Sequence, residues 1–136
     1  MLKKTAILNP ALLQAMAGLG QNDYLVIANA AFPVEPGIPV IDLSLTAGVP
    51  SMEQVLAAVA DELVLDSTIQ PSEWKEDKAA DCREAADAVL GELPVKPVMY
   101  EQVKVLAKHA RAVVRTGDVR PYASLILLAA GLPSKE

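Results

Sequence analysis

Two short runs of apolar residues limit most strongly what this chain can fold into. Residues 24–28 (Tyr-Leu-Val-Ile-Ala) and 125–130 (Leu-Ile-Leu-Leu-Ala-Ala) contain no charged side chain, and each is as long as a β-strand. A continuously apolar strand is typical of a sheet that is covered on both faces. Because segments with helical patterns separate the strand candidates, we expect an α/β layered domain.

Turn and cap residues divide the chain into alternating elements. Strands are predicted at residues 24–28, 40–45, 63–69, 95–99, 112–115 and 124–130. Helices are predicted from Asn9-Pro10 to Gly18, from Pro50-Ser51 to Leu63, from Pro71 to Leu90 and from Glu101 to Ala110. Asn9 before Pro10 reads as a helix N-cap, and Ser51 with Gln54 has the spacing of a capping box.

Composition excludes several classes of protein. At 136 residues one domain is expected, and although 52% of the residues are apolar, no run approaches the roughly 18–20 residues of a membrane span. The net charge of −5 argues against nucleic-acid binding. A single cysteine, Cys82, forms no internal disulfide, and with one histidine there is no Cys/His metal site. We expect spare apolar surface to be buried between subunits.

The first residues imitate a signal peptide. Lys3-Lys4 precedes an apolar stretch, but Asn9, Pro10 and Gln14 interrupt the continuous apolar segment that a signal peptide requires. We therefore expect a cytoplasmic protein.

Three polar segments adjoin the apolar strands. They are residues 19–23, 29–33 and 115–124. Ligands of α/β sheets bind at the carboxyl ends of strands, which is where Asn29 falls. Ordinary turn chemistry is one interpretation of these segments. It accounts less well for Asn29, Tyr122 and Ser124, which favour a small-molecule pocket.

Three isolated residues have simpler interpretations. His109 near a helix end would complement the helix dipole at the surface rather than catalyse. Cys82 in the middle of a helix is expected to be a structural thiol. Trp74 at the start of a helix is expected to be a packing anchor rather than a platform for a sugar.

The separated motifs, in this order, resemble the RbsD/FucU family of ribose pyranases and fucose mutarotases, and the ribose pyranase branch is the closer. They include Leu19-Gly20-x-x-Asp23, Ala30-x-x-Pro33, residues 41–56 (Ile-Asp-Leu-x-Leu-Thr-x-Gly-Val-Pro-Ser, then Gln-Val-Leu) and residues 114–127 (Val-Arg-Thr-Gly-Asp, then Pro-Tyr-Ala and Ile-Leu). The resemblance covers residues 1–136 as a single domain.

The resemblance implies a fold, an assembly and an activity. The fold is a single layered α/β domain with a mainly parallel or mixed sheet flanked by helices. The assembly is a ring-like homo-oligomer, for example a decamer, with sugar sites near subunit contacts. Members of the family interconvert cyclic forms of a free monosaccharide and use no cofactor.

The resemblance also implies site residues, and here the chain departs from the family. The family's histidine after Leu-Gly is Gln21, and the aspartate after the first strand is Asn29. These two and Asp23 are the catalytic candidates. The substrate-binding candidates follow the other motifs: Tyr100, which stands where the pyranase branch has histidine, Tyr122, Ala123, and Ser124, which stands where the family has asparagine.

The substitutions leave three hypotheses open. Ring opening needs a base for the anomeric hydroxyl proton and an acid for the ring oxygen, and neither amide titrates near pH 7. The first hypothesis is an isomerase in which Tyr100, Tyr122 or Asp23 relays protons with a water. The second is a sugar-binding protein without turnover. The third is a different ligand, such as a sugar acid, with positive charge from Lys104, Arg115 and Arg120.

Overall fold

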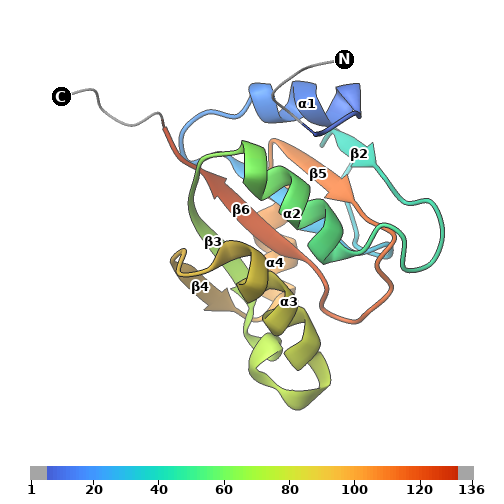
Figure 1. Cartoon of the computed structure of the whole chain (residues 1–136), viewed down its shortest axis with the longest axis vertical. Coiled ribbons are helices and arrows are strands. Elements are labelled where there is room, and N and C mark those ends of the chain that lie inside the picture. The colour runs from blue at the N-terminus through green and yellow to red at the C-terminus, as the bar shows by residue number, and fades with distance from the viewer. Residues whose placement is uncertain (1–5, 132–136) are drawn as a thin grey trace.

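A six-stranded mixed sheet with helices on both faces forms the molecule (Figure 1). The computed structural model describes residues 6–131, so Lys3-Lys4 lies outside it. The strands are β1 (Tyr24–Ala28), β2 (Val40–Asp42), β3 (Leu65–Pro71), β4 (Val95–Val98), β5 (Ala112–Arg115) and β6 (Leu125–Ala129). The helices are α1 (Pro10–Ala17), α2 (Met52–Glu62), α3 (Ala80–Leu90) and α4 (Tyr100–Leu106), with 3-10 turns at Ser72–Lys75, Asp77–Ala79 and Ala107–His109. The expected α/β domain with a mixed sheet is confirmed.

Five of the six described strands run in the same direction, so their carboxyl ends lie along one edge of the sheet, perpendicular to the strands. The order is β2-β5-β1-β6-β3-β4. β1 is parallel to β5 and antiparallel to β6, and β3 is antiparallel to β6 and parallel to β4. β6 therefore runs opposite to the other five strands. The carboxyl ends of those five and the amino end of β6 lie along the same edge.

Alternate residues of β1 face two separate cores. Leu25 and Ile27 pack with α1, α2 and α3, whereas Val26 and Ala28 pack with α4. In Figure 1, α2 and α3 lie in front of the sheet and α4 lies behind it. All four of these side chains are fully buried, as expected for a continuously apolar central strand.

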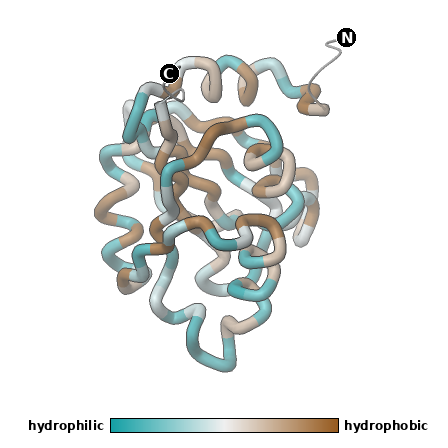
Figure 2. The backbone as a smooth tube through the Cα atoms, turned by 60° about the vertical axis from the view of Figure 1, so that its left-hand side comes forward, coloured by the Kyte–Doolittle hydropathy of each residue, from teal (hydrophilic) through white to brown (hydrophobic). Residues whose placement is uncertain are grey.

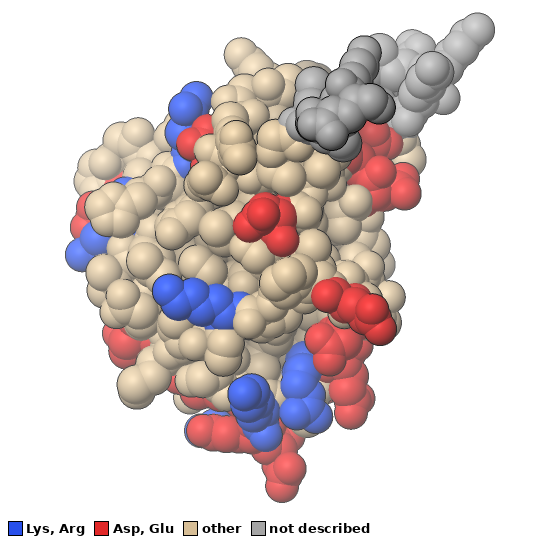
Figure 3. Space-filling model, turned by 90° about the vertical axis from the view of Figure 1, so that its left-hand side faces the viewer, with Lys and Arg blue, Asp and Glu red and all other residues tan. Residues whose placement is uncertain are grey.

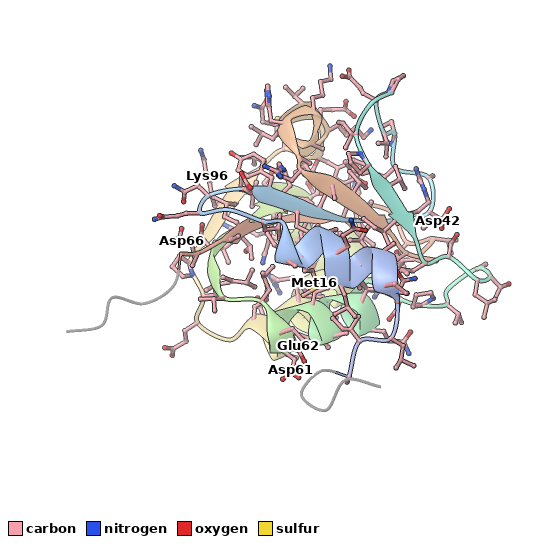
Figure 4. All side chains as sticks on the ribbon, turned by 90° about the horizontal axis from the view of Figure 1, so that it is seen from above. Met16, Asp42, Asp61, Glu62, Asp66 and Lys96 are labelled. Carbon is pink, nitrogen blue, oxygen red and sulfur yellow. The ribbon has the colours of Figure 1, made fainter. Side chains whose placement is uncertain are left out.

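One end of the molecule is hydrophilic. Residues 72–80 project at the bottom of Figures 1 and 2, where the tube is mostly teal. Figure 3 shows charged side chains of both signs gathered toward this end of one face. In Figure 4, Asp42 of β2 and Lys96 of β4 mark the two sides of the sheet, and Asp61 and Glu62 lie exposed at the end of α2. In the described part of the chain, no helix is long and apolar enough to cross a membrane.

Local cap signals predicted helix starts correctly. The Asn9 side chain accepts a hydrogen bond from the Leu12 amide at 2.9 Å, and Pro10 opens α1. At α2, the Ser51 and Gln54 side chains each accept from the other residue's backbone amide, which completes the capping box. These contacts are local, so the sequence alone specifies them.

Two predicted boundaries were wrong. The strand expected to reach Leu45 ends at Asp42, because the Asp42 carboxylate accepts from both the amide and the hydroxyl of Ser44 and turns the backbone. The helix expected from Pro71 begins at Ala80. Pro71 instead continues β3, where it pairs with Val98 of β4, and two 3-10 turns follow.

Candidate functional site

The topology gathers four segments at the edge where five strands end. Asn29 follows β1, Trp74 lies in the turn after β3, Tyr100 follows β4, and Ser124 precedes β6. β6 brings its amino end to this edge because it alone among the described strands runs in the opposite direction. Residues nearly a hundred positions apart in the sequence thus become neighbours.

Ser124 connects two of these segments through one oxygen. Its side chain is fully buried. The Asn29 backbone amide donates to Ser124 Oγ at 2.9 Å, and the Tyr100 hydroxyl lies 3.0 Å from the same oxygen. The two hydroxyls form a hydrogen-bonded pair in which either can donate to the other.

The Asn29 side chain presents an acceptor that has no partner among the described residues. Its Nδ2 donates to the Arg120 backbone carbonyl at 3.2 Å. Its Oδ1 is buried and accepts no hydrogen bond from the described residues. Because a buried acceptor without a donor costs about 1–3 kcal/mol, a donor such as a ligand hydroxyl would stabilise this oxygen.

Tyr100, which contacts Ser124, also forms an aromatic pair with Tyr122. Their ring centroids are 5.3 Å apart and the rings are nearly perpendicular. The Tyr122 backbone has a φ of 64°, which is unusual for a residue other than glycine. Its carbonyl accepts from the Trp74 indole at 2.7 Å and from the Ser124 amide at 2.8 Å. Such strained backbone gathers at functional sites, where the surrounding structure holds it in place.

The environment of Tyr100 keeps its phenol protonated. Burial raises the pKa of Tyr100, and the hydrogen bond with Ser124 only partly opposes this shift. The Tyr100 hydroxyl therefore remains a neutral donor and acceptor at neutral pH. Its backbone amide donates to both oxygens of the Glu73 carboxylate, at 3.0 and 3.1 Å, which fixes the start of α4.

Gln21 and Asp23 lie at the opposite edge of the sheet. Both belong to the turn before β1, and Gln21 is exposed. The Asp23 carboxylate accepts from the Gly20 amide at 2.7 Å and lies 3.5 Å from the Arg111 guanidinium, so it holds the turn together. β1 lies between this turn and Asn29, and a strand of five residues spans about 16 Å. The structure thus brings Asn29, Tyr100, Tyr122 and Ser124 together, but not Gln21 or Asp23.

The other residues that the sequence analysis considered either contact other parts of the protein or are exposed to solvent. The Ala123 side chain is fully buried in the apolar core. Arg115 donates to the carbonyls of Ala30 at 2.8 Å and Phe32 at 3.0 Å. His109 is exposed on a 3-10 turn. Cys82 is buried, as expected for a structural thiol.

Two contributors to the site were missed by sequence reasoning. Trp74 is a buried packing anchor, as predicted, but its indole also holds the Tyr122 carbonyl. Glu73 was not singled out, although it binds the Tyr100 amide. The single tryptophan drew attention to this segment. Nothing local to the segment indicated its distant partners.

Among the described residues, no group of three or more His, Cys, Asp or Glu side chains is placed to hold a metal ion. The site's polar groups are amides, hydroxyls and backbone carbonyls. Such groups can donate to and accept from the hydroxyls of a neutral polar ligand.

Comparison with known proteins gives the site a family context. The model of the RbsD / FucU transport protein family matches residues 2–132. D-ribose pyranases of Pseudomonas putida and Geobacillus kaustophilus are each 42% identical to this chain. The first alignment covers 94% of this chain and 97% of the relative, and the second covers 93% and 92%.

Solved structures share the fold. Bacillus subtilis RbsD complexed with D-ribose superposes with a TM-score of 0.90 at 36% identity, covering 97% of this chain and all of the other. The fucose mutarotase of Streptococcus pneumoniae in complex with L-fucose superposes with a TM-score of 0.73 at 22% identity, covering 92% and 94%. From the matching family model and these relatives, the chain belongs to the RbsD/FucU family.

Proposed function

We propose that this protein interconverts the cyclic forms of a free, ribose-like monosaccharide, as an isomerase of the pyranase and mutarotase type that needs no cofactor. One observation carries the proposal: Asn29, whose buried Oδ1 has no partner among the described residues, is bonded through its backbone amide to the Tyr100–Ser124 hydroxyl pair. An acceptor next to paired hydroxyls suits a polyhydroxylated ligand. The names and the bound ribose of the relatives support the same ligand class.

The reaction needs little from the protein. When the ring opens, the anomeric hydroxyl loses its proton, the bond from C1 to the ring oxygen breaks, and the ring oxygen gains a proton. In our proposal Asn29 Oδ1 accepts from a sugar hydroxyl and orients the ring. The Tyr100–Ser124 pair donates a proton to the ring oxygen, and a water that takes the proton of the anomeric hydroxyl returns a proton to the pair. Closure onto a different hydroxyl, or onto the other face of C1, gives another cyclic form.

A site without turnover is the second candidate. It is favoured by the neutral amides at Gln21 and Asn29, which hold the places of the family's histidine and aspartate. Amides bind sugar hydroxyls but do not titrate near neutral pH, so they cannot act as a general acid or base. This candidate shares the ligand and the site residues with the first and differs only in rate.

We favour a neutral sugar over a charged one. Arg115 is occupied by two backbone carbonyls, and Arg120 by three carboxylates. Lys104 lies 3.1 Å from Glu101. These contacts neutralise or engage the cations that a sugar acid would require.

We also propose that the protein works in the cytoplasm as a ring-like homo-oligomer, for example a decamer. Gln21 and Asn29 lie at opposite ends of β1, so both reach one sugar only if two copies contribute. An apolar groove of about 510 Å³, which includes Leu8, Leu43 and Val55, offers a surface for such contact. Light scattering on the purified protein measures the copy number, and a monomer would contradict this proposal.

Saturation-transfer NMR on ribose tests the activity. We expect added protein to raise the exchange rate between pyranose and furanose forms in proportion to its concentration. Calorimetry with ribose separates the two candidates. Binding without faster exchange would establish the non-catalytic candidate, and neither binding nor faster exchange would contradict both.

A further inference from the structure

Arg120 joins three carboxylates that come from three parts of the chain. Its guanidinium donates to Asp118, 2.7 Å from Nη2 to Oδ2 and 3.1 Å from Nε to Oδ1. It also binds Glu53 in the first turn of α2, and lies 3.4 Å from Asp81 in the first turn of α3. The side chain thereby ties the loop before β6 to two helices.

The Asp118 carboxylate is the buried centre of this cluster. Its side chain is only 3% exposed, and it also accepts from the Met52 amide at the start of α2, at 2.9 Å. Burial raises the pKa of Asp118, but the hydrogen bonds from Arg120 and from backbone amides outweigh burial and leave the pKa below its ordinary value. Asp118 is therefore charged at neutral pH and depends on Arg120 for its counter-charge.

The backbone of the same arginine reaches the sugar site. The Arg120 carbonyl accepts from Asn29 Nδ2 at 3.2 Å, while its amide donates to Asp118 Oδ1 at 3.0 Å. The ion pairs thus fix the residue whose carbonyl orients the Asn29 amide. With Nδ2 bound to this carbonyl, Oδ1 is left as the free acceptor.

We propose that Arg120 is a positioning residue of the sugar site. Its side chain clamps the loop to α2 and α3, and through its own carbonyl it sets the orientation of the Asn29 amide. The same clamp holds the loop that continues to Tyr122. The effect on sugar rests on the proposed function, whereas the effect on the loop does not.

Trp74 provides a direct readout of the loop. It is the only tryptophan in the chain, and its indole Nε1 donates to the Tyr122 carbonyl. A nitrogen–proton correlation spectrum therefore contains one indole signal, which reports that hydrogen bond. We expect Arg120→Ala to shift this signal and the side-chain amide signals of Asn29. Arg120→Lys keeps the charge with fewer donors and should return both signals part of the way.

Lys108→Ala is the matched control. Lys108 forms an exposed ion pair with Glu35, 3.4 Å apart, and lies outside the cluster. Its loss should leave both reporter signals in place. If Arg120→Ala folds with the wild-type circular dichroism and leaves both signals where they were, the proposal is overturned.

The affinity for ribose tests whether Arg120 acts on sugar binding by orienting the Asn29 amide. We expect Arg120→Ala to raise the dissociation constant about tenfold, which corresponds to about 1.4 kcal/mol. In an Asn29→Ala background the same change should have a clearly smaller effect, because the amide that Arg120 positions is gone. Equal effects in the two backgrounds would overturn the claim that Arg120 acts on ribose binding by orienting the Asn29 amide. If the wild type binds no ribose, the proposed function fails, and the two NMR signals still decide whether Arg120 positions the loop.

Discussion

Ser124 is the residue on which the geometry of the site depends most. One buried hydroxyl satisfies the Asn29 backbone amide and the Tyr100 phenol, and so ties the end of β1 to the start of α4. The resemblance placed this residue in the site, but it did not indicate that a serine would bridge two other candidates. That role depends on strand order, which no single segment encodes.

Replacing Ser124 with alanine should weaken both folding and binding. The change leaves the buried Asn29 amide without an acceptor, so we expect the free energy of unfolding to fall by about 1–3 kcal/mol. We also expect weaker ribose binding. Urea denaturation and calorimetry measure the two effects. Ser67→Ala, which removes only an exposed contact with Asp66, should change stability by less than about 0.5 kcal/mol. Equal effects of the two variants would contradict the bridging role.

Cys82 should resist modification in the folded protein. Burial raises the pKa of its thiol from 9.0 to about 11. The folded state thus holds the proton more tightly than the unfolded state. The resulting stability is fully present below pH 9 and is lost as the pH rises toward 11. At pH 8 we expect alkylation by iodoacetamide to be slow in buffer and fast in denaturant. Fast alkylation of the native protein would contradict the buried, neutral thiol.

At the scale of elements, the loop after β5 packs directly on the loop before α2. The Gly117 amide donates to the Pro50 carbonyl at 2.8 Å, and its carbonyl accepts from Gly48 at 2.7 Å. A β-carbon at Gly117 would lie 2.2 Å from the Val49 carbonyl oxygen and 2.6 Å from that of Thr46. Only glycine fits this contact, which carries the chain from β5 toward Asp118 and Arg120.

Gly117→Ala should therefore separate the two loops. We expect it to lower the free energy of unfolding by about 1–3 kcal/mol or more, because the atoms it meets belong to backbone. Gly18→Ala is the matched control. Gly18 has an ordinary helical φ of −86°, and a β-carbon there would meet nothing closer than 3.5 Å. Thermal unfolding of both variants checks the prediction, and a Gly117→Ala protein as stable as Gly18→Ala would refute the packing argument.

Element boundaries were predictable where local chemistry sets them. The caps of α1 and α2 and the central strands followed from nearby residues. The segment from Pro71 to Ala79 was assigned wrongly to a helix, because its structure depends on a distant partner. β4 pairs with β3 as far as Pro71, and in the turn that follows Glu73 and Trp74 bind the backbone of Tyr100 and Tyr122.

At the scale of the whole molecule, the sheet divides the sequence candidates between its two edges. The resemblance placed Gln21 and Asn29 at the positions of the family's acid–base pair, but it did not indicate that β1 separates them. Of the five other candidates, Tyr100, Tyr122 and Ser124 lie with Asn29. Asp23 lies with Gln21 in the turn before β1, and the Ala123 side chain is buried in the core. This separation of the candidates depends on where the ends of β1 lie in the sheet, which the order of motifs along the sequence does not reveal.

Restoring both ionisable groups tests whether two copies complete the site. The double variant Gln21→His, Asn29→Asp should accelerate ribose exchange above the wild type. A 1:1 co-assembly of Gln21→His and Asn29→Asp single variants should recover part of that gain if the two groups meet between copies. Each single variant measured alone is the control. No gain in the double variant, with folding and assembly intact, would show that these positions no longer form an acid–base pair.

The central claim is that the edge of the sheet holding Asn29, Tyr100 and Ser124 is where a monosaccharide changes its cyclic form. The most direct measurement is the saturation-transfer exchange rate of ribose with the wild type, Asn29→Ala and Ser67→Ala at equal concentrations. We predict acceleration by the wild type and by Ser67→Ala, and its loss in Asn29→Ala. Equal acceleration by all three proteins would place the chemistry elsewhere and contradict the claim.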